Sequence, residues 1–192
     1  MIFGGITFGG KLGGWNITNY SAKNLPQPLA SATSDLMTGE LTGFGANYMP
    51  IWYMANQLVN GTNHLLICKQ TRTTREPVKK IVAVNLNIPP SGAITGKGVT
   101  IREIIEDTDL VEGVGPDVNL LQKFEIAATK NGRVGCSFKP ILYVGSQVVK
   151  GINYFIVAEA NINRPGVDPY AVLIKMNVFQ DNPEFVEIVH LQ

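Results

Sequence analysis

Residues 47–67 read NYMPIWYMANQLVNGTNHLLI, and residues 137–157 read SFKPILYVGSQVVKGINYFIV. The two stretches are ninety positions apart, and seven of their twenty-one aligned pairs are identical. Chance would give about one or two identities in such an alignment. The same register continues further along the chain, where residues 84–88 align with residues 174–178. The chain is therefore an internal duplication.

Upstream of each repeated stretch, apolar residues recur at helical spacing. They are Leu25, Leu29, Ala32 and Leu36 in the first copy, and Leu120, Leu121, Phe124 and Ala128 in the second. Gly39 provides a stop for the first helix, and Asp117 provides an N-cap for the second. We therefore expect one helix ahead of the repeated stretch in each copy.

Each repeated stretch itself predicts two β-strands joined by a tight turn. The turns are expected at Asn60-Gly61 and at Lys150-Gly151, because glycine supplies the positive φ that a short hairpin needs. A second pair of strands is expected in each copy, at about 78–88 and 99–105 and at about 170–179 and 185–191. One helix followed by four antiparallel strands predicts an α+β fold, with a helix packed across a curled sheet in each copy.

The 192 residues divide into two units of ordinary small-domain size. Charge and glycine interrupt the apolar pattern near residues 107–115. We therefore predict domain 1 over residues 1–106, with a glycine-rich N-terminal segment, and domain 2 over residues 107–192.

Composition favours a globular protein without an anionic partner. Hydrophobic residues make up 45% and charged residues 16% of the chain, and the net charge is +1 with no basic block. Neither nucleic acid nor a membrane is an expected partner. The start of the chain lacks the basic and apolar regions of a secretory signal, so we expect a cytoplasmic protein, or a secreted one if a leader was removed.

The motifs that carry catalysis are not found in the sequence. It contains no nucleophile elbow, P-loop, dinucleotide fingerprint or HExxH motif. His64 and His190 are isolated and are interpreted as structural, and the two cysteines, Cys68 and Cys136, have no metal-site spacing. We expect no enzyme, no cofactor and no metal, with cysteine-based catalysis as a remote alternative.

The hairpin residues Gln57-Leu58-Val59-Asn60-Gly61 and Gln147-Val148-Val149-Lys150-Gly151 resemble the Gln-x-Val-x-Gly loop of the cystatins. The surrounding residues 146–156 and the run Asn177-Val178-Phe179-Gln180 resemble stefins, the disulfide-free cystatins. Cystatins also carry a glycine a little over forty residues before the loop glutamine, and Gly14 precedes Gln57 by 43 positions. The resemblance thus implies two tandem cystatin-like domains.

The resemblance also implies a function, the reversible and non-covalent inhibition of papain-like cysteine proteases. Such inhibitors block the protease cleft with a glycine-containing N-terminal segment and two hairpin loops. The protease-binding residues that the resemblance implies are Gly13, Gly14, Gln57, Leu58, Val59, Asn60, Gly61, Pro89, Pro90, Gln147, Val148, Val149, Lys150, Gly151 and Pro183. The branched valines lose little rotamer entropy on burial, and the prolines fix the second loops before binding.

The second copy departs from this pattern, because the position 43 residues before Gln147 is Ile104, inside a predicted strand. Domain 1 is therefore expected to be the stronger inhibitor. The expected state is a monomer that can exchange hairpins into a domain-swapped dimer. The alternative function is a non-inhibitory binding or assembly module on the same tandem fold, retargeted as in latexin, which resembles two linked cystatin units and blocks metallocarboxypeptidases.

Overall fold

The computed structural model describes residues 14–27, 29–43, 45–73, 79–106, 115–131 and 134–191. Within this part the protein is mostly β, with 56% strand and 19% helix. The predicted α+β class, with two cystatin-like domains that each pack one helix across a sheet, is therefore wrong. Long strands carry most of the chain, and two antiparallel sheets of five and four strands dominate the architecture.

Both sheets are simple antiparallel meanders, in which each strand pairs with its neighbours in sequence. The first sheet contains β1 (Trp15–Ser21), β2 (Ala46–Val59), β3 (Gly61–Arg72), β4 (Lys79–Ile88) and β5 (Val99–Glu106). The second contains β6 (Cys136–Val149), β7 (Gly151–Ile162), β8 (Tyr170–Phe179) and β9 (Asn182–His190). The predicted hairpins are confirmed at Gly61 and Gly151, whose φ angles are +97° and +90°.

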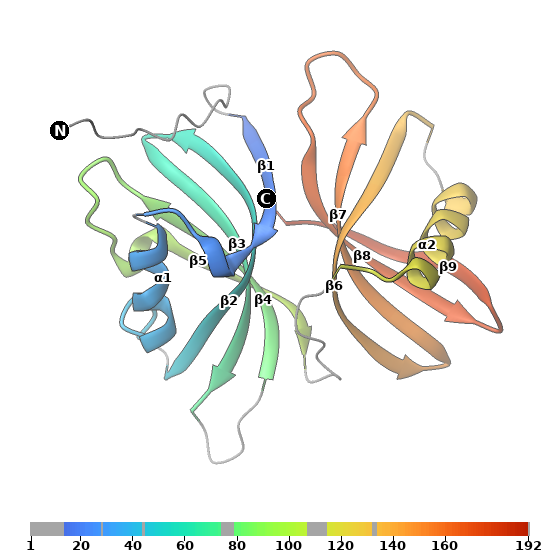
Figure 1. Ribbon diagram of the computed structural model, residues 1–192, viewed down its shortest axis with the longest axis horizontal. Coiled ribbons are helices and arrows are strands. Elements are labelled where there is room, and N and C mark those ends of the chain that lie inside the picture. The colour runs from blue at the N-terminus through green and yellow to red at the C-terminus, as the bar shows by residue number, and fades with distance from the viewer. Residues whose placement is uncertain are drawn as a thin grey trace.

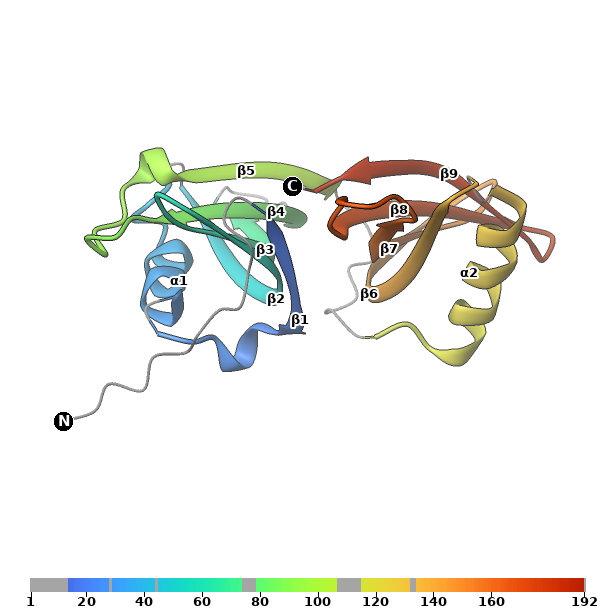
Figure 2. The ribbon, with the colours of Figure 1, turned by 90° about the horizontal axis from the view of Figure 1, so that it is seen from above.

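The two sheets pack against each other. A single buried apolar cluster draws Met54, Leu65 and Ile67 from the first sheet and Leu142, Val157 and Leu173 from the second. The central strands β4 and β7 are apolar on both faces because one face meets the other sheet and the opposite face meets a second core. Figures 1 and 2 show the sheets between the two helices.

The helices are short elements on the outer faces of this pair of sheets. Helix α1 (Leu29–Thr38) buries Leu29, Ala32 and Leu36 in the core of the first sheet, and α2 (Val118–Asn131) buries Leu120 and Phe124 in that of the second. Two 3₁₀ turns, Ala22–Asn24 and Gly96–Gly98, complete the helical structure that is described.

The predicted caps of both helices are confirmed. The Oδ1 atom of Asp117 accepts a hydrogen bond of 2.7 Å from the backbone N–H of Leu120, as an N-cap side chain should. Gly39, with φ of +77°, follows α1 and donates its N–H to the carbonyl of Leu36.

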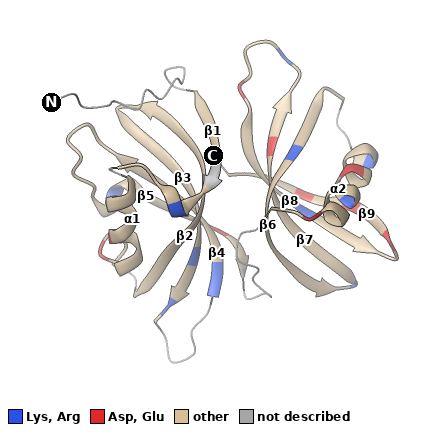
Figure 3. Cartoon of the chain, viewed as in Figure 1, with Lys and Arg blue, Asp and Glu red and all other residues tan. Residues whose placement is uncertain are grey.

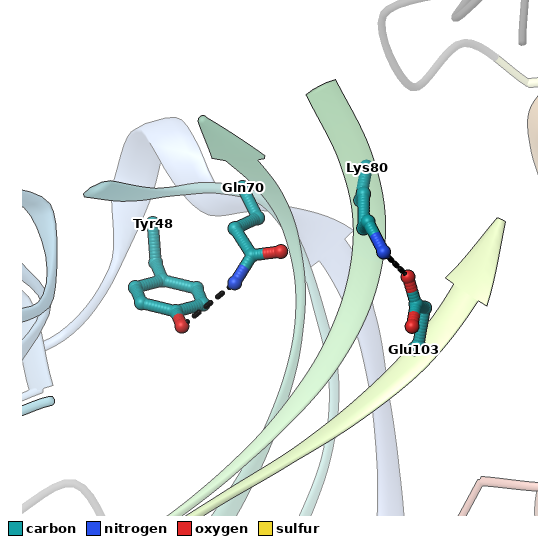
Figure 4. A network of polar contacts seen from close by, with 4 residues as sticks. All are labelled: Tyr48, Gln70, Lys80 and Glu103. Atoms are coloured by element: carbon teal, nitrogen blue, oxygen red, sulfur yellow. Dashed lines mark hydrogen bonds and ion pairs between the residues drawn. The ribbon is translucent and has the colours of Figure 1, made fainter. Parts of the chain in front are cut away.

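A row of polar contacts crosses the first sheet at the end away from the β2–β3 turn (Figure 4). The Nε2 atom of Gln70 donates to the hydroxyl of Tyr48 at 2.8 Å, and the ammonium of Lys80 pairs with the carboxylate of Glu103. Lys80 is buried, so its charge needs this partner. The row joins β2 to β3 and β4 to β5.

Strand β1 was not predicted from the sequence. It pairs antiparallel with the edge of β2, with Trp15 opposite Gln57 and Ile17 opposite Ala55. The second sheet has no counterpart among the described residues, since β6 pairs there with β7 alone. Residues 107–114, where the predicted domain boundary falls, lie outside the described residues.

Candidate protein-binding edge

The β2–β3 turn of the first half is an exposed apolar tip. Leu58 and Val59 are each 40% exposed, and Asn60 is exposed at the turn itself. Leu58 and Val59 are neighbours in the sequence, so together they expose a small apolar surface. The tip is thus able to bury apolar area against another molecule.

Gly61 is required by its close surroundings as well as by its backbone angle. A Cβ atom at this position would lie 2.3 Å from the carbonyl oxygen of Ile88 and 2.8 Å from the Cα of Pro89. These contacts bring the β2–β3 tip against the start of the β4–β5 loop. Two of the three predicted parts of the binding edge are therefore adjacent.

The β4–β5 loop begins with a tight turn. Pro89 is half-buried and Pro90 is exposed, and the N–H of Gly92 donates to the carbonyl of Pro89 at 2.9 Å. Further along, Ile94 packs against the core beneath α1. The loop is thus held on the molecule, with Pro90 at its exposed turn.

The N-terminal glycine lies at the same end. Gly14 directly precedes Trp15, which pairs with Gln57 two residues before Val59. Gly13 lies outside the described residues. Gly14 and the two loops of the first half therefore meet at one end of the strands of the first sheet. We call these three segments the binding edge.

A ladder of amides supports this edge from within the sheet. The Nδ2 atom of Asn63 donates to Oε1 of Gln57 at 2.9 Å, and Nδ2 of Asn87 donates to Oδ1 of Asn63 at 2.7 Å. The ladder ties β2, β3 and β4 together just below the tip. Gln57 was predicted to bind the protease, whereas its side-chain oxygen accepts a hydrogen bond inside the sheet.

The edge of the first half is built from uncharged residues. Residues 41–68 and 81–96 contain no Lys, Arg, Asp or Glu, and Gly14 and β1 contain none either. Figure 3 shows the corresponding ends of β1, β2 and β4 in tan, while α2 and β9 carry charged residues of both signs. A partner of this edge is therefore selected by shape and apolar contact more than by charge.

The second half repeats the arrangement with different chemistry. Val148 and Val149 are 77% and 45% exposed, and a Cβ at Gly151 would lie 2.4 Å from the carbonyl oxygen of Val178. Lys150 places its ammonium 5.1 Å from the ring centre of Phe179. This tip carries a charge that the first tip lacks.

The β8–β9 turn differs from the sequence interpretation. Gln180 and Asp181 both have positive φ, so β9 begins at once and Pro183 is buried in the strand opposite Val178. Pro183 is therefore not offered to a partner. Phe179, which is 39% exposed beside Lys150, was missed as a surface residue, although it stood in the quoted run 177–180.

Two titratable side chains of β3, Cys68 and His64, are buried and neutral at pH 7. Burial raises the pKa of the Cys68 thiol, so this cysteine is a poor nucleophile. Burial also lowers the pKa of His64 to about 4, and its Nδ1 lies 2.8 Å from the hydroxyl of Tyr53. Among the described residues, no group of three or more His, Cys, Asp and Glu could hold a metal ion.

None of the described helices is both long enough and apolar enough to cross a lipid bilayer. In comparisons with known proteins, no family model matches the chain, and no curated protein matches it significantly.

Proposed function

We propose that the protein is a reversible, non-covalent inhibitor of papain-like cysteine proteases, and that the edge formed by Gly14, the β2–β3 tip and the β4–β5 loop enters the protease cleft. The observation that carries this proposal is the meeting of these three segments at one end of the first sheet, with Leu58 and Val59 exposed between them. The resemblance of the tip to the cystatin loop is the reason for naming this class of protease.

The rigidity of the edge supports a blocking function. The amide ladder and the close contact of Gly61 with Ile88 hold the tip before any partner is bound. A preorganised loop loses little conformational entropy on binding, which favours tight association. Inhibition by occlusion needs no reactive group, in keeping with the uncharged residues that form this edge.

The contribution of the tip to the free energy of binding can be estimated from the exposure of its side chains. Burying a whole Leu or Val side chain contributes about 2 kcal/mol, so the 40% that is exposed at Leu58 and at Val59 leaves about 0.8 kcal/mol each. Together they supply about 1.6 kcal/mol, or about fifteenfold in Kd. The rest of the affinity must come from the neighbouring loop and the N-terminal segment.

The test is a titration of papain with the intact chain and with the variant Val59→Asp. An aspartate forced into an apolar cleft loses its hydration without a partner, so inhibition should weaken by about a hundredfold or more. Met49→Asp is the matched control, because Met49 lies on the same strand with the same exposure of 40% and stands away from the tip. It should inhibit like the unchanged chain.

Two results would refute the proposal. The first is an intact chain that leaves papain and related thiol proteases fully active at all concentrations. The second is an equal loss of inhibition in Val59→Asp and Met49→Asp, which would mean that the tip has no special role.

A further inference from the structure

We propose that the hollow between β5 of the first sheet and β8 and β9 of the second binds a small carboxylic acid with an apolar body, and that Arg102 and Lys175 hold its carboxylate. No residue of the binding edge lines this hollow, so the inference does not depend on the proposed inhibition of proteases.

The hollow lies where the last strands of the two sheets come together. Among the described strands, β5 pairs with β4 alone and β9 with β8 alone. A guanidinium N–H of Arg102 on β5 donates to the backbone carbonyl of His190 on β9, which joins the two strands. Figure 2 shows β5 and β9 along one side of the molecule. The hollow beside this contact has a volume of about 380 Å³.

Apolar side chains form much of the wall of the hollow. Those that line it are Ile104, Ile105, Phe155, Leu173, Val189 and Leu191. All six belong to the core between the sheets or pack against it, so the wall is in place before a ligand arrives. An apolar wall with a small number of polar groups is typical of sites for small molecules.

Two cations line the hollow, one from each sheet. Arg102 is exposed on β5, and half-buried Lys175 on β8 places its ammonium 5.9 Å from the ring centre of Phe155. Neither cation forms an ion pair with a described residue. Both are therefore able to bind an anionic group that enters the hollow.

The carboxylates at the hollow limit the charge of that group. Glu103 is paired with buried Lys80, and Glu187 is exposed on β9 opposite Lys175. They would repel a doubly charged group such as a phosphate monoester. A single carboxylate suits Arg102, because His190 occupies one of the five N–H donors of its guanidinium and a carboxylate accepts two in parallel.

The volume of the hollow sets the size of the ligand. Sites for small molecules have volumes of about 300–1,000 Å³, so this one is at the lower end of the range. With roughly 30 Å³ for each group of the size of a water molecule, it holds about a dozen non-hydrogen atoms. Naphthalene-2-carboxylate is an acid of this size.

The test is a calorimetric titration of the full chain with naphthalene-2-carboxylate and, separately, with naphthalene-2-carboxamide. The two ligands have the same shape and differ in charge. The acid should bind with one-to-one stoichiometry and at least about tenfold more tightly than the amide, because hydrogen bonds between charged groups are stronger than neutral ones.

Variants of the lining residues locate the site. Lys175→Met and Arg102→Met each remove one charge and keep an apolar stem, so each should weaken binding of the acid at least about fivefold. Val189→Trp fills the hollow with a large ring and should abolish binding of both ligands. Lys139→Met is the matched control, because Lys139 is exposed on β6 and does not line the hollow, and it should bind the acid like the unchanged chain.

The other outcomes would overturn the proposal. They are equal affinity for the acid and the amide, absence of acid binding at millimolar concentration, and unchanged acid binding in Lys175→Met or in Val189→Trp. An equal loss of affinity in Lys139→Met and Lys175→Met would overturn it too, because the acid would then respond to the overall charge of the chain.

Discussion

The contact between Gly61 and the β4–β5 loop predicts that Gly61→Ala is strongly destabilising. The alanine would have to adopt a φ near +97°, which costs about 1–2 kcal/mol for a residue with a Cβ. Its Cβ would also lie 2.3 Å from the carbonyl oxygen of Ile88, so the backbone of the loop must move, at a further cost of about 1–3 kcal/mol. The expected loss of unfolding free energy is therefore about 2–5 kcal/mol.

The variant Gly92→Ala separates the cost of the positive φ angle from the cost of the steric contact. Gly92 has a comparable φ of +76°, but no atom lies within 4 Å of the position of its Cβ. It should lose only the backbone part, about 1–2 kcal/mol. Urea unfolding of both variants, followed by circular dichroism, measures the difference. If Gly61→Ala is no less stable than Gly92→Ala, the tip does not press against the β4–β5 loop and the account of the edge is wrong.

Three other predictions concern charge, pH and the second tip. Glu103→Gln should lower the unfolding free energy by about 2 kcal/mol in urea, because it removes the carboxylate charge that pairs with the buried ammonium of Lys80, whereas exposed Glu184→Gln should change it little. His64→Gln should lessen the acid sensitivity of the fold. Because burial lowers the pKa of His64 to about 4, this residue contributes stability above pH 6.5 that is lost as the pH falls toward 4, about 2 kcal/mol by pH 5. An unchanged slope of unfolding free energy against pH would count against this prediction. Val148→Asp should leave papain inhibition unchanged, since no described residue of the second half forms a counterpart of Gly14 and β1 beside β6. A loss equal to that of Val59→Asp would reverse the ranking of the two halves.

The local structure could be predicted where single residues dictate it. The turns at Gly61 and Gly151 and the cap at Asp117 follow from backbone angles and hydrogen-bonding groups that few other residues provide. In each half, the second pair of strands (β4 and β5, β8 and β9) also lies close to its expected bounds. These features depend on neighbours in sequence, which the duplication displays twice.

The fold class could not be predicted in the same way, because it depends on what the second face of each sheet meets. Continuous apolar runs at residues 81–84 and 155–158 were a signal that β4 and β7 are buried on both faces. Nothing in those runs identifies the other sheet as the partner. The alternation Trp15-Asn16-Ile17-Thr18 was a signal for β1 that was missed.

The candidate site was foreseen in its apolar tip and less well in its details. Pro183 was expected in an exposed loop, but positive φ angles at Gln180 and Asp181 close the turn early and draw Pro183 into the strand. Gln57 was expected to face a partner, but Asn63 engages its oxygen inside the sheet. Both differences arise from contacts across strands, which sequence spacing does not report.

The most direct measurement of the central claim is a crystal structure of the chain with papain whose catalytic thiol has been blocked by alkylation. The account predicts that Leu58 and Val59 lie in the substrate cleft, flanked by Gly14 and Pro90, with the tip at Val148 outside the interface. A complex formed through the second half, or no complex at all, would contradict it.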